Sequence, residues 1–180
     1  MTRPEFVQFK KMPRLSREII ITEKIDGTNA QVTITEDGEV FAGSRTRWIT
    51  VEDDNHGFAR WVEQNKTELL KLGVGTHFGE WWGTGIQRGY YLSEKRFSLF
   101  NTEKWNDSEV RPKCCHVVPI LYKGPFDTSM INRILELLVI NGSVAAPKFM
   151  NPEGIVIFHT AGNLMFKKTC KDDDKHKGEL

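Results

Sequence analysis

A lysine next to an aspartate and a glycine turn has the clearest capacity for chemistry in this sequence. It is Lys24, within the stretch EKIDGTN at residues 23–29. A lysine amine acts as a nucleophile when it has lost its proton, which burial or a neighbouring cation favours by lowering its pKa. A strand that ends in a solvated lysine and an Asp-Gly hairpin turn would give the same local pattern. The rest of the chain must therefore decide between the two interpretations.

Four further groups of polar residues lie within or beside apolar segments. A buried polar group costs free energy unless it is paired, so each of these groups needs a reason to be there. The groups are SRTR at 44–47, FGEWWG at 78–83, FSLFN at 97–101, and EGIV at 153–156 followed by Lys167 and Lys168.

Most of the elements that position these groups are predicted to be strands. Apolar runs and apolar–polar alternation are typical of strands and of hairpins. They predict strands at 18–23, 29–35, 40–42, 76–82, 96–101 and 114–121, and a hairpin formed by 154–159 and 164–169.

Two helices complete the predicted fold. One runs from a capping residue, Asp54 or Asn55, to Leu72, with Gly73 as its stop. The other runs from near residue 127 to near residue 142, and residues 1–17 form an irregular lead-in. Many antiparallel strands with two packed helices predict an α+β fold.

The composition bounds the possible partners and compartments. The chain has 180 residues and a net charge of only +1, so a nucleic acid would have to be held by a local patch and not by a global basic field. No apolar run approaches the length that spans a membrane. The three cysteines fit no disulfide or zinc pattern, which favours reduced thiols in the cytoplasm, of a bacterial or phage-infected cell among other sources. No linker is evident, so we expect one domain over residues 1–180.

The five groups, taken in order, resemble the nucleotidyltransferase motifs of the covalent nucleotidyltransferases, the superfamily of ATP-dependent ligases and RNA capping enzymes. The Lys-x-Asp-Gly core is common to that superfamily. The wider pattern Glu-Lys-x-Asp-Gly-x-Asn is more similar to the RNA ligases, especially the phage-type and trypanosome editing ligases. The resemblance covers roughly residues 18 to 170. It implies a ligase-type adenylation domain that uses ATP with Mg²⁺ or Mn²⁺.

The resemblance also implies roles for single residues of the nucleotide site. Lys24 would attack the α-phosphorus of ATP, expel pyrophosphate and carry AMP. Glu80 would hydrogen-bond the ribose, and Glu153 would bind the divalent cation, for which carboxylate oxygen is a suitable ligand. Glu23 would lie in the same nucleotide site. Asn29, five residues after the lysine, would bind nucleotide and nucleic acid and would serve ligation after adenylation.

Two pairs of residues compete for one place each. Phe97 and Phe100 lie on opposite faces of one predicted strand, and we favour Phe97 for stacking on adenine. Lys167 and Lys168 are adjacent and also point oppositely, so only one can face the α-phosphate. An even number of residues in the hairpin loop would set Lys168 on the Glu153 face, and an odd number would set Lys167 there. Our first choice is Lys167.

Three arginines are candidates for contact with phosphates. Arg45 and Arg47 lie two residues apart, and their planar forks suit pyrophosphate or a nucleic-acid end. Arg88, in the glycine-rich segment 83–89, is a further candidate for contact with nucleic acid. That segment lacks the Gly-Lys-Ser/Thr ending of a P-loop.

The expected function is an ATP-dependent RNA ligase that joins a 3′-hydroxyl to a 5′-phosphate. Related ligases usually carry a further domain after the last lysine motif, whereas this sequence ends about ten residues beyond Lys168. We therefore expect no C-terminal accessory domain here, so that sealing proceeds unaided, needs a partner protein, or stops after AMP transfer. A DNA ligase-like or capping-type enzyme and a non-catalytic nucleic-acid-binding module are the alternatives.

Overall fold

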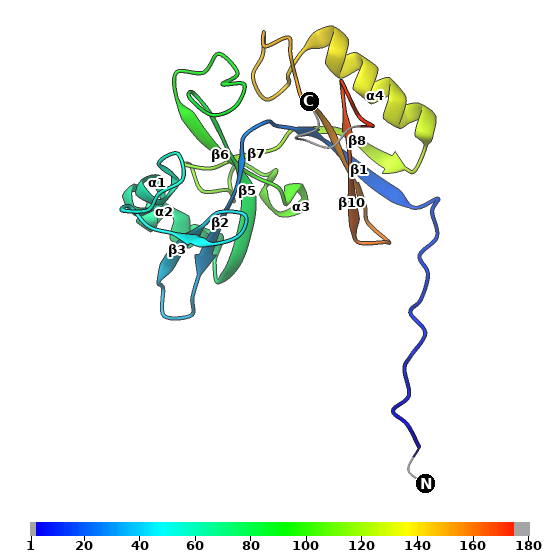
Figure 1. The fold of residues 1–180 in the computed structure, drawn as a ribbon, viewed down its shortest axis with the longest axis horizontal. Helices are drawn as coiled ribbons and strands as arrows, with labels where there is room; N and C mark the ends of the chain where they lie inside the picture. The colour runs from blue at the N-terminus through cyan, green and yellow to red at the C-terminus, as the bar shows by residue number, and fades with distance from the viewer. Residues whose placement is uncertain (1–2, 175–180) are drawn as a thin grey trace.

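A computed structural model describes residues 3–174 as two β-sheets with helices packed on their outer sides (Figure 1). The first sheet has the strand order β10-β9-β1-β8 and the second has the order β4-β3-β2-β5-β6-β7. Strands β1 and β2 follow one another in the chain but belong to different sheets. The connection between them, residues 25–27, therefore crosses from one sheet to the other. This crossing contains the aspartate and glycine of the lysine motif.

The four-stranded sheet carries the lysine motif at one end. Its strands are β1 (Glu18–Lys24), β8 (Ile120–Pro125), β9 (Gly154–His159) and β10 (Leu164–Thr169). Helix α4 (Thr128–Asn141) packs on one face, where Ile19, Ile21, Ile155 and Ile157 meet Leu138. The other face of this sheet includes Lys24, because side chains alternate along a strand.

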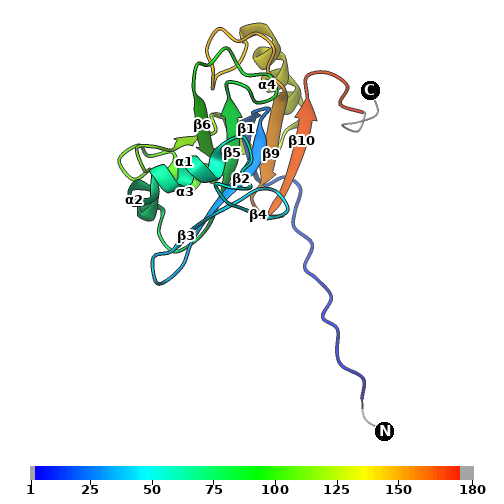
Figure 2. The same cartoon turned by 60° about the vertical axis from the view of Figure 1, so that its left-hand side comes forward.

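The six-stranded sheet carries the acidic and aromatic groups. Its strands are β2 (Thr28–Ile34), β3 (Val40–Gly43), β4 (Trp48–Ile49), β5 (Gly75–Gly83), β6 (Lys95–Leu99) and β7 (His116–Val117). Helices α1 (Phe58–Gln64), α2 (Lys66–Leu69) and η1 (Leu70–Leu72) lie on one face, as the turned view shows (Figure 2). A short helix, α3 (Thr102–Trp105), follows β6. The main apolar core lies under α1 and includes Phe58, Val62, Trp81 and Phe97.

The α+β prediction is confirmed, and several boundaries are close to those expected. The hairpin of β9 and β10 has the predicted limits. Helix α4 begins after Asp127, whose carboxylate accepts hydrogen bonds from the N–H groups of Ser129 and Met130, and ends before Gly142. Gly73 ends η1 with a positive φ of 81°, a conformation that favours glycine.

Two predicted elements are wrong in detail. The single helix from residue 54 to 72 is divided at Asn65, whose side-chain amide donates to the carbonyl of Trp61. Asparagine competes for backbone hydrogen bonds in this way, which weakens a helix interior. The single strand at 114–121 is divided into β7 and β8 by Val118 and Pro119, and proline has no N–H to donate to a sheet.

Three further observations bear on function. No helix within residues 3–174 is both long enough and apolar enough to cross a membrane. All three cysteines are free thiols. Residues 3–17 leave the body as an extended segment and are exposed throughout (Figure 1).

Candidate functional site

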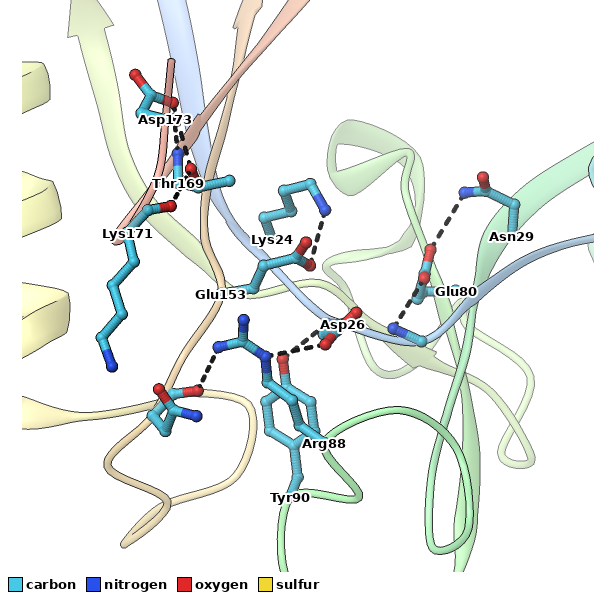
Figure 3. A network of polar contacts seen from close by, with 12 residues as sticks. Lys24, Asp26, Asn29, Glu80, Arg88, Tyr90, Glu153, Thr169, Lys171 and Asp173 are labelled. Carbon is cyan, nitrogen blue, oxygen red and sulfur yellow. Dashed lines mark hydrogen bonds and ion pairs between the residues drawn. The ribbon is translucent and has the colours of Figure 1, made fainter. Parts of the chain in front are cut away.

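Lys24 and Glu153 form an ion pair where β1 and β9 lie side by side. The Nζ atom of Lys24 lies 2.7 Å from the Oε2 atom of Glu153, and the two side chains are 23% and 8% exposed. Lys24 is the last residue of β1 and lies opposite Gly154, so the residue before Gly154 reaches it directly (Figure 3). A Cβ atom at Gly154 would lie 2.2 Å from the carbonyl oxygen of Lys168. The glycine after Glu153 is therefore needed for the close approach of β10.

Glu80 faces the start of β2 from the neighbouring strand β5. Its two oxygens accept from the N–H of Gly27 (3.1 Å) and from the side-chain amide of Asn29 (3.2 Å) (Figure 3). Burial raises the pKa of Glu80 to about 7; the charge of Lys24 and the Gly27 N–H oppose the rise, and Glu153 adds to it. A buried carboxyl group whose pKa is raised close to neutral pH is typical of functional sites.

Gly27 lets the connection between the sheets lie against β5. A Cβ atom there would come within 2.5 Å of the Trp81 carbonyl oxygen and within 2.7 Å of the Trp82 Cβ atom. Because a backbone atom would be struck, any larger residue must push the connection away from the sheet. The glycine of the lysine motif thus sets the distance between Lys24 and Glu80.

Arg88 binds the aspartate of the lysine motif. Its Nε donates to the Asp26 carboxylate at 2.9 Å, and its Nη1 donates to the carbonyl of Asn151 at 2.8 Å (Figure 3). The N–H of Asp26 also donates to the hydroxyl of Tyr90 at 2.7 Å. Arg88 thereby connects the segment of Lys24 to the segment of Glu153. These bonds use Nε and Nη1, and the side chain is 32% exposed, so contact of Arg88 with nucleic acid stays a prediction.

Glu23 lies away from this site although it precedes Lys24. Its carboxylate accepts from the hydroxyl of Ser143 at 2.6 Å and from the N–H groups of Val144 and Ala145, each at 2.8 Å. The side chain is 1% exposed, and burial raises its pKa despite these bonds. Successive side chains of a strand point to opposite faces, so Glu23 points toward the α4 side. Its predicted place among the nucleotide-binding side chains is corrected: it anchors the segment after α4.

The structure does not support Phe97 as the ring that stacks on adenine. Phe97 is 0% exposed and packs against Phe58 and Trp61, with ring centroids 5.1 and 5.7 Å away. It lies opposite Trp81 on β5, and hence on the core face of the sheet. A ring enclosed in this way cannot stack on adenine. Phe100 is 37% exposed and lies three residues further on.

Phe100 belongs to a pocket on the other face of the six-stranded sheet. Its lining combines polar side chains, aromatic rings and a glycine. It is lined by Asn29, Ala30, Gln31, Ser44, Arg45, Phe78, Gly79 and Phe100. The pocket thus brings the predicted residues Asn29 and Arg45 together with Phe100, the alternative to Phe97 in the sequence analysis.

Arg47 does not share this pocket. Its guanidinium makes two hydrogen bonds to the Asp53 carboxylate, at 2.6 and 3.2 Å, and its side chain is 46% exposed. The tight turn 44–47, in which the N–H of Ser44 donates to the Arg47 carbonyl, separates the two arginines in space. Arg45 therefore lines the pocket, whereas Arg47 is paired with Asp53.

Strand pairing places Lys167 on the face of Lys24. Lys167 lies opposite Val156 of β9, and Val156 lies opposite Thr22 of β1. Directly opposed residues share a face of the sheet, and so do residues two apart in one strand. Lys167, Thr22 and Lys24 therefore share a face.

Lys168 lies on the opposite face, across from the buried Ile155, and its Nζ atom is 3.6 Å from the Asp173 carboxylate. The loop 160–163 has an even number of residues, for which the rule above selects Lys168. The rule fails because Glu153 precedes β9. Its side chain does not follow the alternation of the strand and instead reaches Lys24.

Residues 3–174 contain no group of three or more His, Cys, Asp or Glu side chains that could hold a metal ion. Within these residues Glu153 would therefore hold a cation with at most one further side chain of these four types. Mg²⁺ is commonly held by one or two carboxylates together with substrate phosphates and water, and this donor set fits that arrangement.

Tyr90 and Ser143 are the site's supporting residues that sequence analysis missed. Tyr90 is buried, with a positive φ of 55°, in the segment after the glycine-rich stretch. A tyrosine among polar and glycine residues was the available signal. Ser143 directly follows the glycine that ends α4, and nothing in the sequence connects it to Glu23, which lies 120 positions earlier.

Comparison with known proteins identifies the pattern. The family described as RNA ligase matches residues 17–171. A search of the curated proteins returned no match. Among solved structures, a mutant of the Naegleria gruberi RNA ligase without ligand has a TM-score of 0.62 and 19% identity, over 93% of this chain and 57% of that chain.

Two other mutants of the same ligase give similar results. One was solved with ATP and Mn, with a TM-score of 0.64 and 19% identity over 87% of this chain and 51% of that chain. The other was solved with AMP and Mn, with a TM-score of 0.63 and 18% identity over 93% and 57%. At these identities the similarity establishes the fold alone. The matched part covers between half and three fifths of the length of those proteins.

Proposed function

The chain belongs to the RNA ligase family, and from this premise we propose that it is an ATP-dependent polynucleotide ligase that works through an AMP adduct on Lys24. One observation carries the proposal: an amine and a carboxylate 2.7 Å apart, at the junction of two sheets, with Glu80 on the facing sheet. A structural ion pair has no need of a second buried carboxylate whose pKa is near 7.

In the proposed first step the Nζ atom of Lys24 attacks the α-phosphorus of ATP. The ammonium first gives a proton to water. A nitrogen–phosphorus bond then forms as the bond from phosphorus to the bridging oxygen breaks, pyrophosphate leaves, and the second proton released from the nitrogen also passes to water. The ion pair with Glu153 holds the Lys24 amine in place before the nucleotide arrives. Glu80 accepts hydrogen bonds from the ribose. Lys167 binds the α-phosphate, since strand pairing puts it on the same face of the sheet as Lys24.

The adenine of the nucleotide is proposed to stack on Phe100. The ring is partly exposed and borders the pocket that also includes Asn29 and Arg45. A base presents a flat π-face to an aromatic ring, and such stacking contributes about 1–3 kcal/mol. Phe97, fully enclosed by the core, has no part in this contact.

A divalent cation, Mg²⁺ or Mn²⁺, is proposed to be held by Glu153 together with phosphate oxygens. When bound, it would neutralise negative charge on the phosphates and on the leaving group. The solved relatives that carry ATP or AMP also carry Mn, which supports the use of a divalent metal.

The acceptor is proposed to be an RNA 5′-phosphate, which takes AMP from Lys24 and is then joined to a 3′-hydroxyl. Asn29 and Arg45 border the pocket and suit contact with the ends. Arg47, with a side chain that is 46% exposed, is a further candidate for this contact. Because the chain covers 57% or less of its first three solved relatives, sealing by this chain alone and sealing with an accessory protein are both open to experiment.

Product analysis tests this function. RNA with a labelled 5′-phosphate and a free 3′-hydroxyl is incubated with ATP and Mg²⁺ or Mn²⁺, and AMP-capped and sealed products are resolved by gel. We expect AMP-capped RNA from the natural protein, none from Lys24→Ala, and unchanged amounts from Lys113→Ala, an exposed lysine in the loop before β7. A preference for GTP or NAD, or RNA binding without any product, would contradict the proposal.

A further inference from the structure

The extended arm, defined as residues 3–17, differs from the rest of the molecule in exposure. It projects from the four-stranded sheet, and its outer part, residues 3–12, extends away from the other elements in both views (Figures 1 and 2). Its aromatic rings are almost wholly accessible: Phe6 is 87% exposed and Phe9 is 83% exposed. Exposed aromatic rings of this kind are rare on a surface that binds nothing.

The arm also differs in charge. It carries five cationic side chains and one carboxylate, for a net charge of +4, whereas the whole chain has a net charge of +1, which leaves −3 for the remainder. The cations are Arg3, Lys10, Lys11, Arg14 and Arg17. The local basic patch that a nucleic-acid partner requires is therefore concentrated in the arm.

Proline preorganises the arm. Pro4 and Pro13 each fix φ near −65° and restrict the preceding residue to extended conformations. An arm that is already extended loses less conformational entropy when it binds an extended ligand. Its rings and cations are then offered along a line of up to about 50 Å, at about 3.3 Å per residue.

The base of the arm is fixed at the opposite end of β1 from Lys24. The Nε2 atom of His159 donates to the carbonyl of Leu15 at 2.8 Å, and the N–H of Phe126 donates to the carbonyl of Arg17 at 2.9 Å. Strand β1 then runs from Glu18 to Lys24, a length of about 20 Å at about 3.3 Å per residue. The arm thus begins about 20 Å from the proposed nucleophile.

We propose that the arm binds the single-stranded RNA substrate outside the reactive ends, with Lys10, Lys11 and Arg14 on phosphates and Phe6 and Phe9 stacked on bases. The inference rests on the proposed function, because it takes the polynucleotide of that reaction as the ligand. Interleaved cations and aromatic rings are the combination that binds single strands without sequence preference. A second copy of the chain, whose body is net negative, is the competing occupant, and the test includes it.

Fluorescence anisotropy with a labelled RNA of about 24 nucleotides measures the interaction. Replacing Lys10, Lys11 and Arg14 by Ala together should weaken binding at least tenfold and reduce the slope of log affinity against log salt by about 2, since each phosphate contact on a single strand contributes about 0.7. The charge-preserving control is Lys10→Arg, Lys11→Arg and Arg14→Lys. It should keep both the affinity and the slope.

The two rings are tested in the same assay. Phe6→Ala with Phe9→Ala should weaken binding about tenfold or more without a change in the salt slope, because stacking releases no counterions. Phe6→Tyr with Phe9→Tyr should restore it. All of these side chains are exposed and lie outside the core, so the variants should unfold at the same temperature as the natural protein.

Substrate length provides a sharper readout. A stacked single strand advances about 3.4 Å per nucleotide, so an oligonucleotide shorter than about six nucleotides cannot lie at Lys24 and also reach the arm. The arm variants should therefore transfer AMP to a 5′-phosphorylated trinucleotide at the natural rate and to the 24-nucleotide RNA with a raised KM and an unchanged kcat.

The outcomes separate failure of this inference from failure of the proposed function. Labelling with ATP alone reports the function and does not require the arm. If the natural protein labels but the arm variants bind long RNA as tightly and with the same salt slope, the inference is wrong. If the variants change only the mass measured by light scattering, the arm docks on a second copy and does not bind RNA.

Discussion

Glu23 and Glu80 are both buried glutamates beside the lysine motif, yet the chain surrounds them differently. Glu23 receives three hydrogen bonds of 2.6 to 2.8 Å from the Ser143 hydroxyl and two backbone N–H groups. Glu80 receives two, at 3.1 and 3.2 Å, and one of these comes from the exposed Asn29 side chain. Burial raises the pKa of both carboxyl groups.

The difference separates an anchor from a site. The donors to Glu23 belong to one rigid segment on the far side of the sheet, so its bonds stabilise the fold. One donor to Glu80 is the exposed Asn29 side chain, which lines the pocket, and the longer bonds leave the carboxylate able to accept from a ligand. A buried carboxylate therefore indicates function only when its partners face a cleft.

Removal of each carboxylate is the strongest way to break this comparison. Glu23→Ala leaves the buried Ser143 hydroxyl and the partly buried N–H groups of Val144 and Ala145 without their acceptor. We expect a loss of about 3–5 kcal/mol in the free energy of unfolding, measured by urea denaturation. Glu80→Ala, the matched control, should change it by less than about 1 kcal/mol. Equal losses would contradict the distinction.

Titration of Glu80 sharpens the comparison. Its pKa in the folded protein, about 7, lies above the ordinary value of 4.5, so the folded state binds this proton more tightly than the unfolded state. The free energy of unfolding should therefore fall as pH rises from about 4.5 to about 7 and stay low above that range, by at most about 3 kcal/mol.

Glu80→Gln removes this titration. The variant should match the natural protein near pH 4 and be more stable than it at pH 8, while its rate of AMP labelling falls. Glu52→Gln, at an exposed position, is the control and should leave the pH dependence as it is. A variant that is less stable at pH 8 would show that Glu80 is an anchor like Glu23.

Replacing Arg88 tests whether its bonds to Asp26 and Asn151 hold Lys24 and Glu153 in position. Arg88→Ala separates Asp26 from Asn151, so Lys24 and Glu153 lose their fixed relation, and we expect AMP labelling to slow about ten- to hundredfold. The KM for ATP should change little. Arg88→Lys, which keeps the charge but not the fork, should recover part of the rate. Normal labelling with weakened RNA binding would instead favour the contact with nucleic acid first predicted for Arg88.

The two phenylalanines give the smallest expected effect. Phe100→Ala should raise the KM for ATP about tenfold, the equivalent of about 1.4 kcal/mol of stacking, with little change in stability. Phe100→Trp should restore the KM. Phe97→Ala is the matched substitution in the core and should act on stability instead. A raised KM for ATP from Phe97→Ala in a protein that is still folded would reverse the assignment.

Several elements could be predicted because their signals are local. The hairpin of β9 and β10 follows from two apolar strands around a Gly-Asn turn, and α4 follows from its Asp127 cap and the glycine after it. The positions of Lys24 at the end of β1, Glu80 within β5 and Glu153 just before β9 also follow from local patterns. The motif order was enough to predict the fold class and the family.

The remaining features depend on contacts between distant segments. Which ring of Phe97 and Phe100 is enclosed depends on the face that α1 covers, and that face is set by packing far from β6. The partners of Glu23 and Asp26 lie 120 and 62 positions away. The loop rule selected the wrong lysine because it assumed that Glu153 follows the alternation of β9. Glu153 lies before that strand, and its side chain does not follow the alternation.

The central claim is that Lys24 is the nucleophile. Its most direct test is intact-protein mass spectrometry after incubation with ATP and Mg²⁺, followed by peptide mapping of the adduct. We predict one added AMP, located on Lys24 in the peptide that contains EKIDGTN, and no adduct on Lys24→Ala. An adduct on another residue, or labelling that persists in Lys24→Ala, would contradict the account.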